Sequence, residues 1–198
     1  MDHSGTSPGT SDDAAPGASA EDRLTALAAR VADLESRLAE LDARAARSAD
    51  ELAVLHLVAA YAPAVDAGLA EEVAALWAPD GVYDVDTGVL DGRAAVADMV
   101  AGTEHRGLIA HGCAHLPGLP RVEIDGGRAV ATGHTLLVVR SSTPGRYSVV
   151  RATANRWELA RTEPTDGDPH RGWRVTRRTA RVLDADGSGR AVLARADR

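Results

Sequence analysis

Between residues 21 and 48, apolar side chains recur at alternating spacings of three and four residues. This is the a/d pattern of a heptad repeat, which packs helices together along a narrow apolar seam. The seam consists of Leu24, Leu27, Val31, Leu34, Leu38 and Leu41. The pattern predicts a coiled-coil helix over residues 21–48. The same register reaches Leu52 and Leu55, which would let the helix continue into the next segment.

Charged residues beside this seam favour pairing between two copies of the chain. The g positions are all arginine, at Arg23, Arg30, Arg37 and Arg44. In a parallel pair, Arg30 would meet Glu35 of the second copy, whereas an antiparallel pair would place arginine against arginine. We therefore predict self-association through this helix. The alternative is a lone amphipathic helix that folds against its own domain.

The patterns from residue 49 to 184 predict one α+β domain. Two helices are expected over residues 50–78, the first with Pro63 in its last turn, and a third over residues 93–100. A short strand over residues 82–86 precedes that third helix. Four longer strands follow, at about 109–124, 128–141, 146–162 and 172–184. Helices followed by long antiparallel strands predict a curved sheet with helices on one face.

The two ends of the chain carry less information. Residues 1–20 are rich in Ser, Gly, Pro, Ala and Asp and show no apolar period, so a disordered tail is expected there. They also lack the basic and apolar regions of a signal peptide. Residues 185–198 are expected to form a loose C-terminal tail.

Composition excludes several classes of function. All 22 basic residues are arginine, and without lysine neither Schiff-base chemistry nor a P-loop is possible. A net charge of −7 without a basic cluster argues against nucleic acid and anionic membranes as partners. The single cysteine cannot form an internal disulfide, and no apolar run approaches the length of a membrane span. A cytoplasmic location is the expectation.

The segment from Ile109 to Ile124 holds the main candidate chemistry. His111, Cys113 and His115 occupy alternate positions, and in a strand such residues point to the same face. A metal site on these three side chains is one interpretation, but the spacing is not a standard one and Gly112 suggests a bend. We therefore predict no metal site and take His115 as the chemical centre.

Several short motifs, in order, resemble one known superfamily. They are Tyr61-x4-Asp66, Leu76-Trp77-Ala78-Pro79-Asp80-Gly81, Asp91-Gly92-Arg93, His115-x7-Glu123 and Gly172-Trp173-Arg174-Val175-x2-Arg178. From about residue 52 to 183 the chain resembles the cone-shaped superfamily of SnoaL-like polyketide cyclases, ketosteroid isomerase, scytalone dehydratase and hexachlorocyclohexane dehydrochlorinase. Nuclear transport factor 2 has the same fold. The resemblance implies a sheet curled around the first helices of the domain and a mostly apolar pocket inside it.

The resemblance also implies roles for individual residues. His115 falls at the catalytic histidine of the dehydratase and the dehydrochlorinase, and Asp66 at the carboxylate that pairs with it. His134 matches the spacing of a second pocket histidine, and Asn155 lies near a pocket asparagine. The base of the isomerase lies near Asp84 or Asp86. The pocket arginine of the dehydrochlorinase could correspond to Arg156 or Arg161, whereas its pocket lysine has no counterpart, so dechlorination is not implied.

The chemistry predicted from these residues is proton removal by a His–Asp base. Asp66 would fix the tautomer of His115 and leave its other ring nitrogen free to take a proton next to a carbonyl group. The candidate donors to the resulting enolate oxygen are Tyr61, Tyr83, His134 and Asn155. Trp77 and His111 complete the predicted substrate-binding set, although Trp77 also fits a role in core packing.

We therefore expect a cofactor-independent lyase or isomerase (a dehydratase, cyclase or double-bond isomerase) that acts on a small, largely apolar carbonyl or polyketide-like substrate. Self-association is expected through residues 21–48 and through the sheet. The alternative is a non-catalytic small-molecule-binding or assembly module of the same fold, in which Asp66 would not reach His115 or side chains would fill the pocket.

Overall fold

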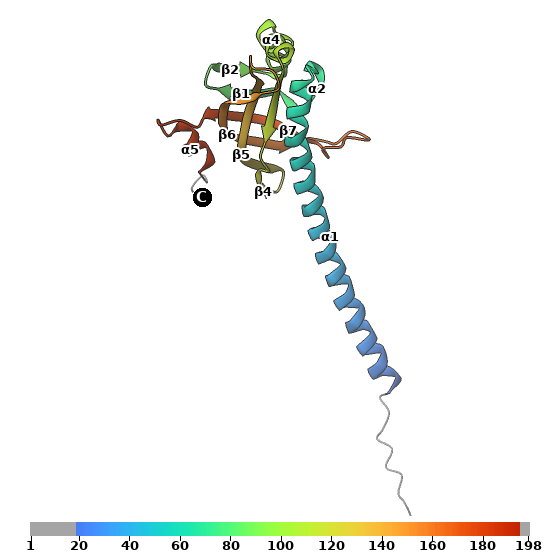
Figure 1. Ribbon diagram of the computed structural model, residues 1–198. Coiled ribbons are helices and arrows are strands. Elements are labelled where there is room, and N and C mark those ends of the chain that lie inside the picture. The colour runs from blue at the N-terminus through green and yellow to red at the C-terminus, as the bar shows by residue number, and fades with distance from the viewer. Residues whose placement is uncertain (1–18, 195–198) are drawn as a thin grey trace, which may run out of the picture. The chain divides into compact units, whose positions relative to one another are not determined.

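The computed structural model describes residues 19–194, which fall into two compact units that meet between Ala46 and Arg47. Helix α1, Ala20–Asp66, contributes to both units and is continuous through Pro63 (Figure 1). No break separates the predicted coiled-coil helix from the first helix of the domain. Ser19 and Asp22 cap the start of α1 reciprocally, because the Ser19 Oγ accepts from the Asp22 N–H and the Asp22 carboxylate accepts from the Ser19 N–H. The rest of the tail predicted for residues 1–20 lies outside the described residues.

The heptad seam of the first unit is open to solvent. Leu24 is 67% exposed, and the other five seam residues are exposed to between 46% and 60%. Arg37 forms an ion pair with Asp33 of the same helix, at 3.0 Å. The amphipathic pattern therefore forms a helix whose apolar stripe is uncovered within this unit.

The second unit is built on one seven-stranded sheet in the order β2-β1-β7-β6-β5-β3, with β4 also paired to β5 (Figure 1). The strands are β1 Trp77–Val85, β2 Gly88–Asp91, β3 Cys113–Pro117, β4 Arg121–Asp125, β5 Arg128–Arg140, β6 Tyr147–Arg161 and β7 Trp173–Val182. All pairings are antiparallel except that of β1 with β7, which is parallel. The predicted α+β fold with a curved sheet is confirmed, and the sheet is mixed and does not close.

The remaining helices are short, and two of them differ from the sequence-based expectation. They are α2 Ala70–Ala75, α3 Arg93–Ala101, α4 Thr103–His111 and α5 Ser188–Leu193. The single strand expected over residues 109–124 is instead the end of α4 followed by β3 and β4. Gly112 causes this break, because its φ of +98° suits glycine and ends the helix one residue before β3 begins. Helix α5 lies in the segment for which a loose tail was predicted.

The core of the second unit lies between the C-terminal part of α1 and the inner face of the sheet. Five large side chains from α1, Val54, Leu57, Val58, Tyr61 and Val65, are buried there. They pack against the three tryptophans of the sheet, Trp77, Trp157 and Trp173. The Tyr61 ring lies 5.7 Å from Trp77 and 5.4 Å from Trp157, which are ordinary distances for packed aromatic rings. In the described part of the chain, no helix is both long and apolar enough to span a bilayer.

Candidate functional site

Asp66 and His115 are joined directly, although they lie on different elements of the fold. Asp66 is the last residue of α1, and His115 is the middle residue of β3. Asp66 Oδ1 lies 2.6 Å from His115 Nδ1, and Oδ2 accepts the His115 backbone N–H at 2.7 Å. A carboxylate that holds both the ring and the backbone of one residue fixes the position of the imidazole. Because Nδ1 faces a carboxylate, it carries the proton, and Nε2 is the nitrogen with the free electron pair.

His115 lines a small cavity of about 60 Å³. The wall consists of Tyr61, Tyr83, Val85, His115, Thr135, Leu137, Arg151, Thr153, Arg178 and Ala180. At roughly 30 Å³ per water molecule, this space corresponds to about two waters or one small functional group. The wall combines a few apolar side chains with one imidazole, two phenols and two guanidinium groups.

The surroundings of His115 favour its neutral form. Burial is the largest effect and lowers the pKa of the imidazole from its usual value near 6.5. The contacts with Asp66 raise the pKa, while the positive charge of Arg178 and the nearby His105 lower it further. The His105 ring centre is 6.5 Å from that of His115. The net direction is downward, so His115 is unprotonated at neutral pH and suited to accept a proton.

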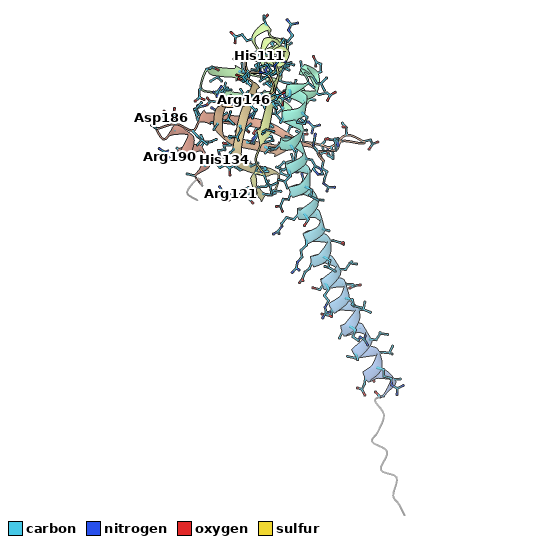
Figure 2. All side chains as sticks on the ribbon, viewed as in Figure 1. His111, Arg121, His134, Arg146, Asp186 and Arg190 are labelled. Atoms are coloured by element: carbon cyan, nitrogen blue, oxygen red, sulfur yellow. The ribbon has the colours of Figure 1, made fainter. Side chains whose placement is uncertain are left out.

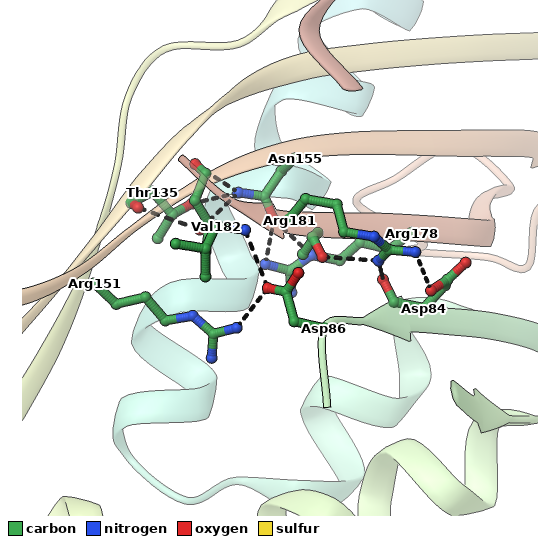
Figure 3. A network of polar contacts seen from close by, with 10 residues as sticks. Asp84, Asp86, Thr135, Arg151, Asn155, Arg178, Arg181 and Val182 are labelled. Atoms are coloured by element: carbon green, nitrogen blue, oxygen red, sulfur yellow. Dashed lines mark hydrogen bonds and ion pairs between the residues drawn. The ribbon is translucent and has the colours of Figure 1, made fainter. Parts of the chain in front are cut away.

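Arg178, which was absent from the predicted site, is the most deeply buried charge in the cavity wall. It is only 3% exposed, and its Nε and Nη2 donate to Asn155 Oδ1 at 3.1 and 2.8 Å (Figure 3). Its guanidinium carbon lies over the rings of Tyr61, Tyr83 and Trp157, at 4.2, 4.5 and 4.0 Å from their centres. The third guanidinium nitrogen, Nη1, is buried without a hydrogen-bond partner among the described residues.

A bulge in β7 explains why strand alternation did not reveal Arg178. Trp173 and Val175 face the core, and strict alternation would then turn residue 177 inward and residue 178 outward. The register against β6 shifts between Glu158 and Leu159, so that Thr176 is an extra residue on β7. Arg178 and Ala180 therefore face inward instead. The signal that was available is the position of Arg178 at the end of the Gly172-to-Arg178 motif.

The two tyrosines that were predicted as donors both line the cavity. Burial, the largest effect, raises the pKa of the Tyr61 phenol far above its usual value near 10. Arg178 acts in the opposite direction but does not outweigh it. Tyr61 is therefore a neutral hydroxyl at any working pH and can donate a hydrogen bond.

The other predicted site residues lie elsewhere. His134 is exposed, because β5 turns Thr135 and Leu137 toward the cavity, and alternation puts His134 on the opposite face. His111 is the exposed last residue of α4, where its Nε2 lies 2.9 Å from the Arg140 carbonyl oxygen. Figure 2 shows His111 and His134 in separate parts of the second unit. The shared strand face expected for His111, Cys113 and His115 therefore does not form.

Asn155 and Trp77 contribute to the site only indirectly. The Asn155 amide is occupied by Arg178 and by Thr135 and Thr153, so it orients the arginine from outside the cavity wall. Trp77 is fully buried in the core, in agreement with the packing role considered for it. Neither residue belongs to the wall of the cavity.

The charged alternatives suggested by the resemblance are engaged in other contacts. Arg156 pairs with Glu158, Arg161 pairs with Asp50, and neither lines the cavity. Asp84 pairs with Arg177 and Arg181, which lowers its pKa, and Asp86 pairs with Arg151. Within residues 19–194, no group of three or more His, Cys, Asp or Glu side chains is placed to hold a metal ion.

Comparisons with known proteins agree with this architecture. The SnoaL-like domain model matches residues 46–179. An NTF2-like protein with a cystatin-like fold from Novosphingobium aromaticivorans is 36% identical, with a TM-score of 0.74, over 80% of this chain and 97% of its own. Among curated proteins, no match is found.

Two more distant structures share the fold. Hexachlorocyclohexane dehydrochlorinase LinA-type3 from Novosphingobium barchaimii is 18% identical with a TM-score of 0.56, over 73% of this chain and 91% of its own. A protein from Catenulispora acidiphila, solved in complex with S-DNPA, is 20% identical with a TM-score of 0.54, over 67% and 92%. On the match over residues 46–179 and the 36% identical structure, this chain belongs to the family of SnoaL-like domain proteins.

Proposed function

We propose that the protein is a cofactor-independent lyase or isomerase in which His115 is the base and Asp66 its orienting partner. The observation that carries the proposal is the 2.6 Å contact between Asp66 Oδ1 and His115 Nδ1, which leaves Nε2 free on a ring that lines the cavity. The lowered pKa of His115 supports it, because the imidazole is then unprotonated at neutral pH. In the alternative, a non-catalytic binding module, no proton transfer would require Asp66 to fix the tautomer of His115.

The proposed reaction begins with proton transfer from carbon to nitrogen. His115 Nε2 takes a proton from the carbon next to a carbonyl group, and the electron pair of that C–H bond becomes the carbon–carbon double bond of an enolate. The carbonyl π electrons move to the oxygen, where the hydroxyls of Tyr61 and Tyr83 are the candidate donors. Asp66 stabilises the imidazolium that forms.

The second half of the reaction returns the proton. If the imidazolium protonates a different carbon, the product is an isomer. If it protonates a hydroxyl group that leaves from the neighbouring carbon, the enolate collapses and water is lost. If the enolate carbon attacks a second carbonyl group of the same molecule and the imidazolium protonates the alkoxide that forms, the product is a ring. All three outcomes share the same first step, so a test of that step tests the proposal.

The first step is measurable without knowledge of the natural substrate. The probes are pyruvate and pyruvamide, two methyl ketones with the same number of non-hydrogen atoms. Their methyl protons exchange with deuterium in D₂O when a base forms the enolate, and proton NMR follows the loss of the signal. We expect the protein to accelerate exchange of at least one probe, and His115→Gln to lower the rate by about 10²- to 10⁴-fold.

His56→Gln is the matched control, because His56 is an exposed histidine of α1 that does not line the cavity. It should exchange at the wild-type rate. Circular dichroism and thermal unfolding should show that both variants fold. An exchange rate for His115→Gln equal to that of His56→Gln would contradict the proposal, as would the absence of acceleration with both probes.

We also propose that the protein self-associates through the seam of α1. Six apolar seam residues are between 46% and 67% exposed, and an exposed apolar stripe of this length favours association. In the full chain, Leu27→Glu combined with Leu34→Glu should lower the mass measured by analytical ultracentrifugation. The matched control is Arg30→Glu, which keeps the seam and should weaken pairing less. An unchanged mass for the leucine variant would exclude the seam as the site of association.

A further inference from the structure

Arg178 is a buried cation without an anion beside it. Its two hydrogen bonds go to the neutral oxygen of Asn155, and among the described residues no carboxylate lies within ion-pair distance of it. Removing an ionised group from water is costly unless an opposite charge accompanies it. The faces of Tyr61, Tyr83 and Trp157 offset part of this cost. The positive charge of Arg178 that remains uncompensated lies in the wall of the cavity.

A second guanidinium group lines the same cavity. Arg151, on β6, donates from Nη2 to Asp86 Oδ2 at 2.8 Å, and its Nε is buried without a partner among the described residues (Figure 3). The cavity thus has two guanidinium groups in its wall, and each has one buried nitrogen that donates no hydrogen bond to the described residues. Two N–H donors from guanidinium groups are suited to the two oxygens of a carboxylate.

We propose that this cavity binds the carboxylate group of its substrate, and that the substrate class is a small oxo acid. Arg178 and Arg151 hold the carboxylate, and the carbon next to the carbonyl group lies toward His115 Nε2. This inference names the substrate class for the reaction proposed above and therefore rests on it. The anion site itself is tested separately, by binding.

The arrangement also suits the chemistry of an oxo acid. Removal of a carbon-bound proton from a carboxylate adds a second negative charge to a molecule that already carries one. In water the existing charge makes an oxo acid anion a weaker carbon acid than its neutral amide, whereas two fixed guanidinium groups stabilise the added charge. The deeply buried arginine in the wall therefore contributes to binding and to the reaction.

Binding is tested with oxamate and oxamide, which resemble pyruvate in size and cannot form an enolate. The two differ in one group, a charged oxygen in oxamate and an NH₂ in oxamide. Isothermal titration calorimetry of the full-length protein, in a buffer without phosphate or carboxylate, should give at least a tenfold higher affinity for oxamate. Equal affinities, or no binding of oxamate, would overturn the inference and would mean that Asn155 and the three rings suffice for Arg178.

Variants assign the binding to the two arginines. Arg151→Met and Arg178→Met should each lower the oxamate affinity at least tenfold, whereas Arg156→Met should not change it. Arg156 is the matched control, because it lies on the same strand as Arg151, pairs with Glu158 and is absent from the cavity wall. Should Arg178→Met fail to fold, Arg151→Met still decides the question. Oxamate binding that survives in Arg151→Met would overturn the inference.

The experiments also distinguish a failure of the anion site from a failure of the proposed function. His115→Gln should lose exchange of the pyruvate methyl protons and still bind oxamate. If oxamate binds through the arginines but no probe exchanges, the base-catalysed function fails and the anion site stands. If pyruvamide exchanges as fast as pyruvate and oxamate does not bind, the proposed function stands and an oxo acid is excluded as the substrate class.

Discussion

Two polar pairs each contribute one residue to the cavity wall, and these pairs, Asp66–His115 and Arg178–Asn155, are built in opposite ways. In the first, a carboxylate faces an imidazole at 2.6 Å and also accepts a backbone N–H, so its own requirements are met within the protein. In the second, a buried cation faces a neutral amide and three aromatic rings, and one of its nitrogens makes no hydrogen bond within residues 19–194. The first pair is complete without a ligand, and the second is not.

In the proposed reaction, this difference assigns proton transfer to the Asp66–His115 pair and binding of the substrate carboxylate to Arg178. A base must be held in one tautomer before the substrate arrives, and a complete local network achieves this. A recognition group must be preorganised and still lack a partner, because its strongest contact is reserved for the ligand. The aromatic rings around Arg178 fix its position without neutralising its charge.

The largest expected effect concerns the partner of the base. Asp66→Asn removes the negative charge that holds the Nδ1 proton, so the imidazole can adopt the other tautomer and loses support for its charged form. We expect deuterium exchange to fall by about 10²- to 10⁴-fold, close to the effect of His115→Gln. Oxamate affinity should remain within about twofold of wild type. A rate loss for Asp66→Asn below tenfold would show that the carboxylate is a structural partner only.

The second effect concerns the partner of the arginine and appears in stability. Asn155→Leu removes both hydrogen bonds of Arg178 at a site where Asn155 is 1% exposed. The cation would then be buried against rings alone, and we expect the free energy of unfolding to fall by about 2–4 kcal/mol. Urea denaturation measures the change. The bound carboxylate should recover part of it, so a midpoint insensitive to oxamate would contradict the proposed anion site.

The third effect is a dependence on pH, from the lowered pKa of His115. In the folded protein the imidazole resists protonation, whereas in the unfolded chain it titrates near 6.5. Stability from this residue is therefore constant above pH 6.5 and falls below it, by at most about 1.4 kcal/mol per pH unit, until the folded pKa is passed. The exchange rate should likewise be flat near neutral pH and decline only in acid. Chemical denaturation and deuterium exchange at several pH values measure these two dependences. In His115→Gln, the loss of stability below pH 6.5 that comes from this residue should disappear.

Sequence alone predicted the contact between Asp66 and His115 but not the inward position of Arg178, and the reason lies in the backbone. Asp66 and His115 stand at positions that the family resemblance marks, one at a helix end and one in a short strand. Arg178 faces inward only because of the bulge at Thr176, which shifts the register of β7 and has no simple sequence signature. His134 shows the converse limit, because alternation predicts which residues share a face but not which face is inside.

The same limits apply to the fold. The order of elements and the α+β class followed from periodicity, because amphipathic helices and alternating strands carry strong signals. Helix α4 was missed because its residues show little amphipathic pattern, and none of them is buried. For α1, the heptad seam predicts the helix itself, and self-association through the seam stays a prediction.

The smallest expected effect concerns His105, a neighbour of the Asp66–His115 pair. His105 Nε2 lies 2.8 Å from the Val65 carbonyl oxygen, which can only accept, so Nε2 carries a proton. Gln can donate to the same oxygen, so His105→Gln keeps this contact and removes a group that lowers the pKa of His115. The acid limb of the exchange profile should move upward by less than one pH unit, with an unchanged rate at pH 8. A movement in the opposite direction would mean that His105 stabilises the charged imidazolium, which would make the Asp66–His115 pair less self-contained than its geometry indicates.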